Sequence, residues 1–456
     1  MMSITEVLIT TVSERIHKDM KKVIIIGGGA AGMMAAISAS GEGKRVILLE
    51  RNEKLGKKLF ITGKGRCNIT NACGAEEFLS HVATNSRFLY SSFSRFNNDD
   101  MIRLLNDAGL KTKVERGQRV FPQSDHSSDV IGTLKRLCDR NGVQIHYHTK
   151  VEKILLHHDA GNASFAGVQL SDGKTIEGDS LILAAGGCSY TSTGSDGDGY
   201  RLARSVGHSI KPPYPSLVPF IMKENWCREL MGLTLKNVSI RVKQQKKVIY
   251  EGFGEFLFTH FGVSGPLVLT ASTCLGKYQK ALEDGRLTLI LDLKPSLTAE
   301  QLEKRYLREF DIYRNKNISN VIERMLPRKM VPVFLREAGV PEDKKVRDIT
   351  KKERRRMIEI MKGLEMHIAG VRGFEEAIVT RGGVSVKEVS PTTMESKLVK
   401  NIFFAGEILD VDAVTGGFNL QIAWSTGYTA GFFAVHCIIK CNKRYLKTLV
   451  AFIFFL

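Results

Sequence analysis

The sequence lacks the cysteine patterns that zinc sites and secreted disulfide folds require. Eight cysteines are scattered over 456 residues, and none of them forms a Cys-x-x-Cys pair. No group of residues has the spacing of metal ligands. We therefore expect no metal site, and we expect a location in the reducing cytoplasm.

Long apolar runs are also missing. A membrane-spanning helix needs about 20 apolar residues, whereas the apolar run Leu449–Leu456 has only eight. Residues 1–19 carry no secretion signal, and Met20 directly precedes KKVIIIGGG, as a natural protein start would. We expect residues 1–19 and 437–456 to be extensions of the domains, and we expect no stable membrane insertion.

Acidic residues are the minority among the charged ones. The chain has 66 Lys and Arg against 48 Asp and Glu, a formal net charge of +18, and the densest basic run is KKERRR at Lys351–Arg356. No aromatic residue interrupts this run to stack on bases, so a solvated helix face is the favoured interpretation. Nucleic-acid binding is the alternative, and the charge keeps it open.

What the sequence does contain begins with a glycine pattern. The β-branched run Val23–Ile26 precedes Gly27-x-Gly29-x-x-Gly32, a helix-forming run follows, and a second strand ends at Glu50. The glycines permit a tight turn, close approach of a pyrophosphate and close packing of helix on strand, while the acid accepts ribose hydroxyls. The pattern predicts a dinucleotide site with contacts from Gly27, Gly29, Ala30, Ala31, Gly32, Glu50 and Arg51.

The far end of the chain indicates which dinucleotide is bound. LILAAGG (181–187) and IFFAGEILD (402–410) have buried-strand patterns, and TGGFNLQIAWSTG (415–427) predicts a loop entering a helix. A nucleotide domain that opens near residue 20 and closes after residue 430 is typical of FAD-dependent folds. N–H groups at the helix start would face the flavin N1/C2=O edge. Further contacts are expected from Val151 at the adenine, Glu407 at a ribityl hydroxyl, and Ala185, Gly186, Gly406, Gly417, Asn419 and Leu420.

The loop TGKGRCNITN (Thr62–Asn71) is the third candidate segment. Its glycines allow close backbone approach, and Lys64 or Arg66 can offset phosphate charge. The alternative is a redox dithiol of Cys67 and Cys73. Five residues separate these cysteines where disulfide-reducing flavoproteins have four, and a second GxGxxG is missing. We favour cofactor contacts from Lys58, Gly63, Gly65, Arg66 and Cys67, with the cysteine packing as a small apolar group.

Several long strings together resemble one known family. They are GGGAAGMMAA, EKLGKKLFITGKGRCNITNA, ERGQRVFPQSDHSSDV, FTHFGVSGP, TRGGVSVKEV and FFAGEILDVDAVTGGFNLQIAWSTGYTAG, in order over roughly residues 20–432. The chain is similar to the bile-acid-inducible flavoprotein (BaiN)-like family of FAD-dependent oxidoreductases. The resemblance implies an FAD domain, a β-barrel-like insert and a small helical insert. It also implies reduction of C=C bonds in 3-oxo steroid (bile-acid) substrates, the activity of the named member.

The expected fold class is α/β. A Rossmann-like FAD-binding domain carries an inserted β-barrel-like domain and a small helical insert. Prolines and short alternating strands after Lys211 indicate the barrel, and amphipathic periodicity indicates the helices. We expect the FAD domain at 20–195 and 381–436, the barrel at 196–295 and 362–380, and the helical insert at 296–361.

Hydride transfer to an enone needs a donor that polarises the carbonyl and an acid that protonates the α-carbon. His260 in FTHFGVSG and Arg381 in TRGG are the catalytic candidates. A structural histidine and a phosphate or carboxylate clamp are their alternatives. We expect a small-molecule substrate with NAD(P)H as a dissociable donor, and the oligomeric state is left open. An RNA-binding or RNA-modifying flavoprotein and a dithiol oxidoreductase are the competing functions.

Overall fold

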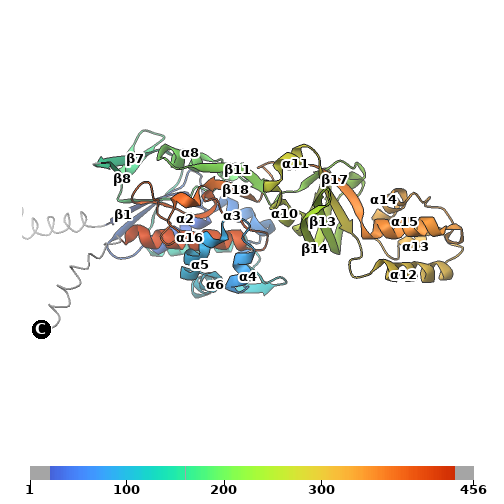
Figure 1. The fold of residues 1–456 in the computed structure, drawn as a ribbon. Coiled ribbons are helices and arrows are strands. Elements are labelled where there is room, and N and C mark those ends of the chain that lie inside the picture. Colours follow the sequence, from blue (N-terminus) through green and yellow to red (C-terminus); the bar gives the residue numbers. More distant parts are fainter. Residues whose placement is uncertain (1–20, 160, 437–456) are drawn as a thin grey trace, which may run out of the picture. The chain divides into compact units, whose positions relative to one another are not determined.

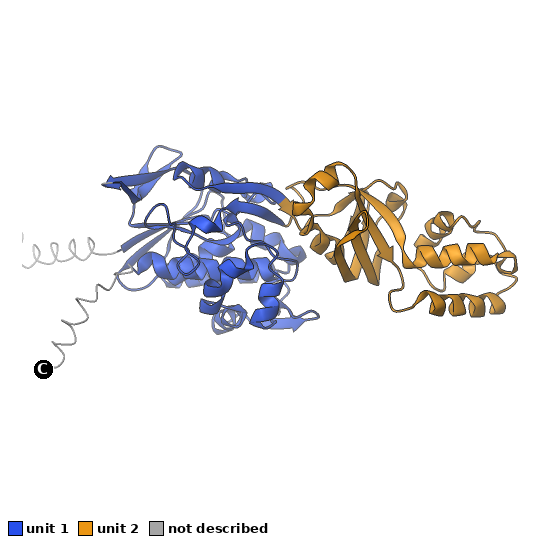
Figure 2. Ribbon diagram, viewed as in Figure 1, with its two compact units in different colours: residues 1–214, 379–456 blue, residues 215–378 orange. Residues whose placement is uncertain are grey.

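The computed structural model describes residues 21–159 and 161–436. The chain divides into two compact units, coloured separately in Figure 2. Unit 1 takes the residues up to Tyr214 and from Val379 onward, and unit 2 is Pro215–Ile378. The extensions expected at 1–19 and 437–456 lie outside the described residues.

Unit 1 is built on a five-stranded parallel sheet with the order β19-β10-β1-β2-β6. Val23, Ile24 and Ile25 at its centre are fully buried. Continuous β-branched runs are typical of parallel strands that are covered on both faces. The strands are β1 (Lys21–Ile26), β2 (Lys44–Leu49), β6 (Gln144–His146), β10 (Ser180–Leu183) and β19 (Ile402–Phe404).

Two helices that are far apart in the sequence pack against each other in unit 1 (Figure 1). They are α2 (Ala30–Ala39) and α16 (Phe418–Val435). Glycines on α16 make this approach possible. A Cβ at Gly427 would lie 2.4 Å from the Ala31 carbonyl oxygen, and one at Gly431 would lie 2.3 Å from the Ala35 carbonyl oxygen. Any larger residue at either position would push the helices apart. The closing helix therefore lies directly on the helix of the glycine fingerprint.

Smaller elements surround this core. Three small sheets have the orders β3-β5-β4, β7-β8-β9 and β11-β18. Their strands are β3 (Thr70–Asn71), β4 (Thr112–Glu115), β5 (Arg119–Pro122), β7 (Val151–Asp159), β8 (Asn162–Leu170), β9 (Thr175–Glu177), β11 (Ile210–Ser216) and β18 (Val379–Val384). The other α-helices described in this unit are α3 (Lys57–Ile61), α4 (Ala75–Ser80), α5 (Tyr90–Arg95), α6 (Asn98–Asp107), α7 (Ser127–Arg140) and α8 (Asp198–Ser205).

Unit 2 combines a closed barrel with a layer of helices (Figure 1). The barrel order is β12-β15-β14-β13-β16-β17, with every pair antiparallel. The strands are β12 (Phe220–Met222), β13 (Thr234–Gln244), β14 (Lys247–Thr259), β15 (Gly262–Ser264), β16 (Leu287–Asp292) and β17 (Leu364–Val371). The helices are α9 (Trp226–Glu229), α10 (Pro266–Ser272), α11 (Gln279–Glu283), α12 (Ala299–Ile312), α13 (Ile318–Ile322), α14 (Val331–Ala338) and α15 (Lys351–Lys362).

The expected architecture, a Rossmann-like domain with a barrel and helices inserted into it, is confirmed. The start of the insert differs from the sequence expectation of residue 196. Unit 2 begins at Pro215, because helix α8 contacts β7 and β18 of unit 1. Over the described residues, no helix combines the length and the apolar character needed to cross a bilayer.

Candidate functional site

The glycine turn after β1 has the geometry of a phosphate cradle. Gly27 has φ +103°, and a Cβ at Gly32 would lie 1.8 Å from the Gly27 carbonyl oxygen, so both positions require glycine. A Cβ at Gly29 would meet nothing within 4 Å. Helix α2 starts at Ala30 with no side-chain cap. The first N–H groups of the helix, including that of Ala31, are thus suited to an anion in the space beside Gly29.

Glu50 is held in a fixed position at the end of β2. Its Oε2 accepts the Gly28 N–H at 2.7 Å, and its Oε1 accepts the Asn52 backbone N–H at 2.8 Å and the Asn52 amide at 2.7 Å. A carboxylate offers about four lone-pair sites. Three are already used, which leaves room for one ribose hydroxyl unless the Asn52 amide turns away. The residue is buried, as expected for the acid of a dinucleotide fold.

The chain around residues 146–151 runs beside this acid. Backbone N–H groups of His148 and Thr149 donate to the Asn52 and Glu50 carbonyls. Val151 starts β7 a few residues later and is 3% exposed. Arg51 points elsewhere, because it forms a two-pronged ion pair with Asp196 at 2.9 and 2.7 Å. In this structure Arg51 therefore has a carboxylate partner, and its predicted contact with the cofactor stays a prediction.

The closing segment meets the fingerprint helix directly. A Cβ at Gly406 would lie 2.7 Å from the Ala31 Cβ, and the Gly406 N–H donates to the Thr426 hydroxyl at 2.9 Å. Ala185 and Gly186 follow β10, the strand between β1 and β19. The structure thus brings the two ends of the predicted cofactor site together, although nearly four hundred residues separate them in sequence.

Glu407 lies at the centre of a polar network. Its carboxylate pairs with Lys58 at 2.5 Å and accepts the Ser189 hydroxyl at 2.6 Å and the Thr380 N–H at 2.8 Å. The Lys58 ammonium also donates to Ser189 at 2.6 Å. Burial alone would raise the pKa of Glu407, but the charge of Lys58 and these hydrogen bonds bring it below its usual value. The charged carboxylate is therefore favoured over the neutral acid, and it accepts these hydrogen bonds.

The loop at 62–67 has an unusual backbone. Gly63, Lys64 and Cys67 all adopt left-handed conformations, with φ of +58°, +59° and +59°. Gly65 also has positive φ, and a Cβ there would meet nothing within 4 Å. Non-glycine residues seldom adopt this conformation, and they concentrate at functional sites. The loop is thus a strained turn rather than an ordinary one.

Arg66 in this loop is engaged by protein carboxylates. Its guanidinium pairs with Glu115 at 2.5 Å and Asp125 at 2.6 Å and lies 4.1 Å from the centre of the Phe121 ring. Lys113 pairs with the same Asp125 at 2.6 Å. These contacts attach the loop to the β4–β5 hairpin. A phosphate contact from Arg66, expected from the sequence, stays a prediction, and the observed partners give Arg66 a positioning role.

The two cysteines of the dithiol alternative are both free thiols. Cys67 is fully buried, and burial raises its pKa to about 12. Burial also raises the pKa of Cys73 to about 11. Thiolates are the reactive species in dithiol exchange, and these environments disfavour them. The geometry supports the interpretation of Cys67 as a small packed group.

Helix α16 starts immediately after a glycine loop. Gly417 has φ +97°, and a Cβ there would lie 2.4 Å from the Thr70 carbonyl oxygen. The Asn419 side chain accepts the Ala413 N–H at 3.0 Å and donates to the Ala413 carbonyl at 2.8 Å, which fixes the loop before the helix. Asn419 and Leu420 fall in the first turn, where backbone N–H groups have no partner inside a helix.

The two catalytic candidates belong to different units. His260 is in unit 2, in the turn between β14 and β15; it is exposed and stacks edge-on against Phe261. No hydrogen-bond partner of its ring is found over the described part of the chain, so the interpretation as a hydrogen-bonded structural histidine has no support. Arg381 is half-buried in β18 of unit 1, where its charge acts on Asp410.

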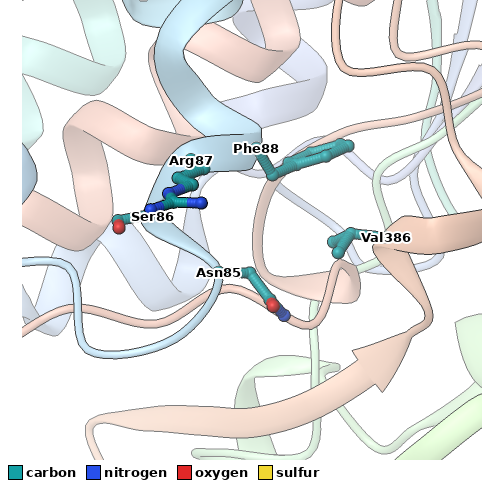
Figure 3. Close-up of a pocket in the computed structure, with 5 residues that line it drawn as sticks. All are labelled: Asn85, Ser86, Arg87, Phe88 and Val386. Carbon is teal, nitrogen blue, oxygen red and sulfur yellow. The ribbon is translucent and has the colours of Figure 1, made fainter.

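A pocket of about 360 Å³ lies on unit 1, and Asn85, one of its lining residues, contacts Asp410. Its lining residues are Asn85, Ser86, Arg87, Phe88 and Val386 (Figure 3). The Asn85 amide donates to the Asp410 carbonyl at 2.7 Å and to its carboxylate at 3.1 Å. Burial raises the pKa of Asp410, against the opposing effects of Asn85 and Arg381. A carboxyl group with a raised pKa is a candidate proton donor.

Four polar residues of this site were not singled out from the sequence. Asn52, Ser189 and Thr380 hold the two glutamates, and Asp410 lies beside Arg381. Two of them could have been found from the sequence, because Asn52 follows the nucleotide acid Glu50 and Ser189 follows a glycine pair at the end of a strand. The other two depend on contacts between distant segments, which one sequence does not reveal.

Comparison with known proteins adds to this geometry. The model of the HI0933-like protein Rossmann domain matches residues 21–433. The chain belongs to the HI0933-like family. This membership and the relatives below confirm the resemblance inferred from the sequence, and the family fold is a Rossmann-type FAD-binding fold.

Two similar relatives span nearly the whole chain. A 3-dehydro-bile acid delta(4,6)-reductase of Clostridium scindens is 32% identical over 415 residues, covering 90% of this chain and 98% of the relative. A ribosomal RNA dihydrouridine synthase of Haemophilus influenzae is 30% identical over 408 residues, covering 89% of this chain and 96% of the relative. These two relatives of the chain are named for two different substrates.

Solved structures with low sequence identity share the fold. The 3-ketosteroid delta1-dehydrogenase from Sterolibacterium denitrificans, in complex with 1,4-androstadiene-3,17-dione, matches with a TM-score of 0.50 and 14% identity. The match covers 91% of this chain and 99% of that structure. This likeness supports the fold alone.

Proposed function

We propose that this member of the HI0933-like family is an FAD-dependent reductase of a C=C bond conjugated to a carbonyl, with NAD(P)H as the electron donor. The supporting observation is the contact between the fingerprint helix and the closing segment, in the unit that also holds Glu50, Glu407 and two helix starts without a side-chain cap. That set fits an extended dinucleotide with a flavin at one end. FAD supplies hydride-transfer chemistry when it is bound.

The residues of unit 1 have distinct roles in holding the cofactor. The space beside Gly29 and the start of α2 suit the pyrophosphate. Glu50 accepts a ribose hydroxyl, and Glu407, kept anionic by Lys58, accepts a ribityl hydroxyl. The first-turn N–H groups of α16 suit the flavin N1/C2=O edge, where a helix N-terminus stabilises negative charge. The loop at 62–67 covers the cofactor, and its shape is maintained by Arg66.

The substrate needs a cation and an acid. We assign Arg381 to the carbonyl oxygen, where negative charge accumulates as the β-carbon accepts hydride. The α-carbon then needs a proton, and Asp410 is the candidate in the same unit as Arg381, whereas His260, the candidate from the sequence, belongs to unit 2. His260 is exposed, and Asp410 has a raised pKa and adjoins a pocket. We place the protein in the cytoplasm, in line with its free thiols.

The leading substrate class is a 3-oxo steroid of the bile-acid type. It follows from the Clostridium scindens relative, which is named for a delta(4,6) reduction of such a compound. The steroid is a small, largely apolar molecule, and the site offers a small number of polar groups for its orientation.

The second candidate substrate is a uracil base in RNA. The C5=C6 bond of uracil is conjugated to the C4 carbonyl, so its reduction to dihydrouracil uses the same hydride and proton as enone reduction. The net charge of +18 favours this candidate, and so does the Haemophilus influenzae relative, which is named for rRNA dihydrouridine synthesis. The two candidates therefore differ in substrate and share their chemistry.

The test is anaerobic stopped-flow spectroscopy of the purified yellow protein. The flavin should bleach with NADH or NADPH and recover its colour with a 3-oxo-Δ4 steroid or with uracil-containing RNA, while a saturated 3-oxo steroid serves as the matched inert control. Arg381→Gln should slow the return of the flavin colour at least about a hundredfold, because removing one donor from an oxyanion hole slows catalysis by that factor. The rate of flavin bleaching by NADH or NADPH should not change. Protein that is colourless and stays so after FAD is added would refute the proposal.

A further inference from the structure

One end of the helical layer in unit 2 carries cations that form no ion pair within residues 21–159 and 161–436. We define the basic end as Arg314, Lys316, Lys351, Lys352 and Arg355. All five are exposed. Over the described residues, none of them forms an ion pair with a carboxylate. Residues 314–316 and 345–355 together contain eight Lys or Arg against two Asp or Glu.

Backbone contacts gather these residues at the start of α15. The Val346 N–H donates to the Lys316 carbonyl at 3.0 Å, and the Arg347 N–H donates to the Arg314 carbonyl at 3.1 Å. The chain then reaches α15 within a few residues. Positions in a helix are 100° apart, so Lys352 and Arg355 lie on the side of α15 away from its buried residues, and Lys351 lies at the border between the two sides. That buried side is formed by Met357, Ile358, Ile360 and Met361.

Two of the nearby carboxylates neutralise other cations. Glu353 pairs with Lys344 at 2.7 Å, and Glu303 pairs with Arg354 at 3.3 Å. These pairs face the interior of the layer and leave the outer cations uncompensated. Lys351 and Lys352 also occupy the first turn of α15, where the helix dipole disfavours positive charge. Positive charges that repel one another and oppose the helix dipole lower the stability of the fold. Binding of an anion explains their presence better than a contribution to solubility does.

We propose that the basic end binds the sugar-phosphate backbone of the RNA substrate. This proposal rests on the second candidate function and assigns it a docking surface. Several phosphates in a row match a surface with five unpaired cations, whereas a single steroid carboxylate would need only one. A membrane is a poorer match, because residues 314–316 and 345–355 expose no large apolar side chain and only Ile312, two residues before Arg314, comes close to them in sequence. The absence of aromatic residues in KKERRR fits backbone contacts that do not stack on bases.

The test compares two triple variants of the full-length, FAD-loaded chain. The first is Lys351→Gln, Lys352→Gln and Arg355→Gln. The matched control, Lys236→Gln, Lys246→Gln and Lys280→Gln, removes the same charge from exposed cations elsewhere in unit 2. Binding of a fluorescein-labelled RNA hairpin of about 20 nucleotides is measured by anisotropy from about 50 to 300 mM KCl. Vesicles of phosphatidylcholine with phosphatidylserine form a parallel arm, and flavin content and thermal midpoint verify folding.

The parent and the control should bind the hairpin with the same steep salt dependence. The first variant should bind about ten- to a hundredfold more weakly at 100 mM salt, with a slope of log affinity against log salt that is smaller by about 2. Equal binding by both variants would overturn the assignment of this surface. A parent that binds the vesicles but not the RNA, or binds neither, would overturn the inference. Steroid-driven flavin reoxidation in the same preparations tests the proposed reductase separately.

Discussion

The Lys58–Glu407 ion pair provides the sharpest test of how the two ends of the chain are joined. Its 2.5 Å contact links residues 349 positions apart, and each side chain is 21% exposed. Replacing Lys58 by Met preserves most of the aliphatic stem and leaves Glu407 as an uncompensated carboxylate. Removal of one partner of a fully buried pair costs about 3–5 kcal/mol. Because this pair keeps some solvent contact, we expect a loss of about 2 kcal/mol in the free energy of unfolding of unit 1.

The adjacent lysine supplies a matched control. Lys57 pairs with Glu53 at 3.4 Å, and the Glu53 side chain is 52% exposed, so Lys57→Met should cause no measurable loss. Urea unfolding in saturating FAD can be followed by fluorescence of Trp424, which is fully buried in unit 1. A Trp226→Phe background removes the second tryptophan, in unit 2. The fluorescence then reports on the unit that contains the ion pair.

The pH dependence fixes the sign of the effect. In the parent the pKa of Glu407 is lowered, so its contribution to stability is present above the ordinary carboxyl pKa and is lost only as the pH falls through the lowered value. Without Lys58, burial dominates and raises the pKa of Glu407 in the folded state. The penalty is then largest at high pH and is relieved as the carboxyl takes up a proton. The difference in the free energy of unfolding between the parent and Lys58→Met should become smaller from pH 8 towards pH 5. A difference that stays constant or grows would refute the reasoning.

Further predictions concern the cofactor cradle and its loop. Gly29→Ala should keep the thermal midpoint of the parent, because the added methyl group meets no protein atom. It should weaken the affinity for FAD at least about tenfold, because the methyl group enters the pyrophosphate space. Gly32→Ala should lower the thermal midpoint itself, because its Cβ would lie 1.8 Å from a carbonyl oxygen. Cys67→Ser should retain turnover, and Cys67 should resist iodoacetamide at pH 8, since its pKa is about 12; fast labelling would contradict its burial. Arg66→Gln should lower kcat, because the loop at 62–67 loses its ion pair with Glu115 and is displaced. The Kd for FAD, measured by titration, should be nearly unchanged. A large rise in this Kd would show that the guanidinium leaves Glu115 to bind phosphate.

Much of the fold could be predicted because it depends on local patterns. The buried run before Gly27 and the three glycine positions follow from the close packing of strand, turn and helix, and the structure shows that packing. The resemblance over six long strings then specified the barrel and the helical insert. Their expected boundary at 196 was misplaced because the helix at 198–205 is amphipathic, and its apolar side could have packed on either unit.

The fine structure of the site was harder to predict because it depends on distant partners. Arg66 looked like a phosphate ligand, since its partners Glu115 and Asp125 come from a hairpin about fifty residues away. Glu407 could be identified from its place after a buried strand, but its lysine and serine partners come from two other segments. Side-chain networks of this kind have no sequence period, so only the folded arrangement reveals them.

The pairing of β11 with β18 has a consequence for synthesis on the ribosome. These two paired strands flank unit 2 in the sequence, so the chain leaves unit 1 and re-enters it through neighbouring strands. The central sheet is incomplete until β19 emerges, some 220 residues after β10. At about 5–20 residues per second that interval lasts about 10–45 s. The nascent chain thus carries an unfinished sheet while the inserted barrel is made, and chaperone demand should be highest in that window.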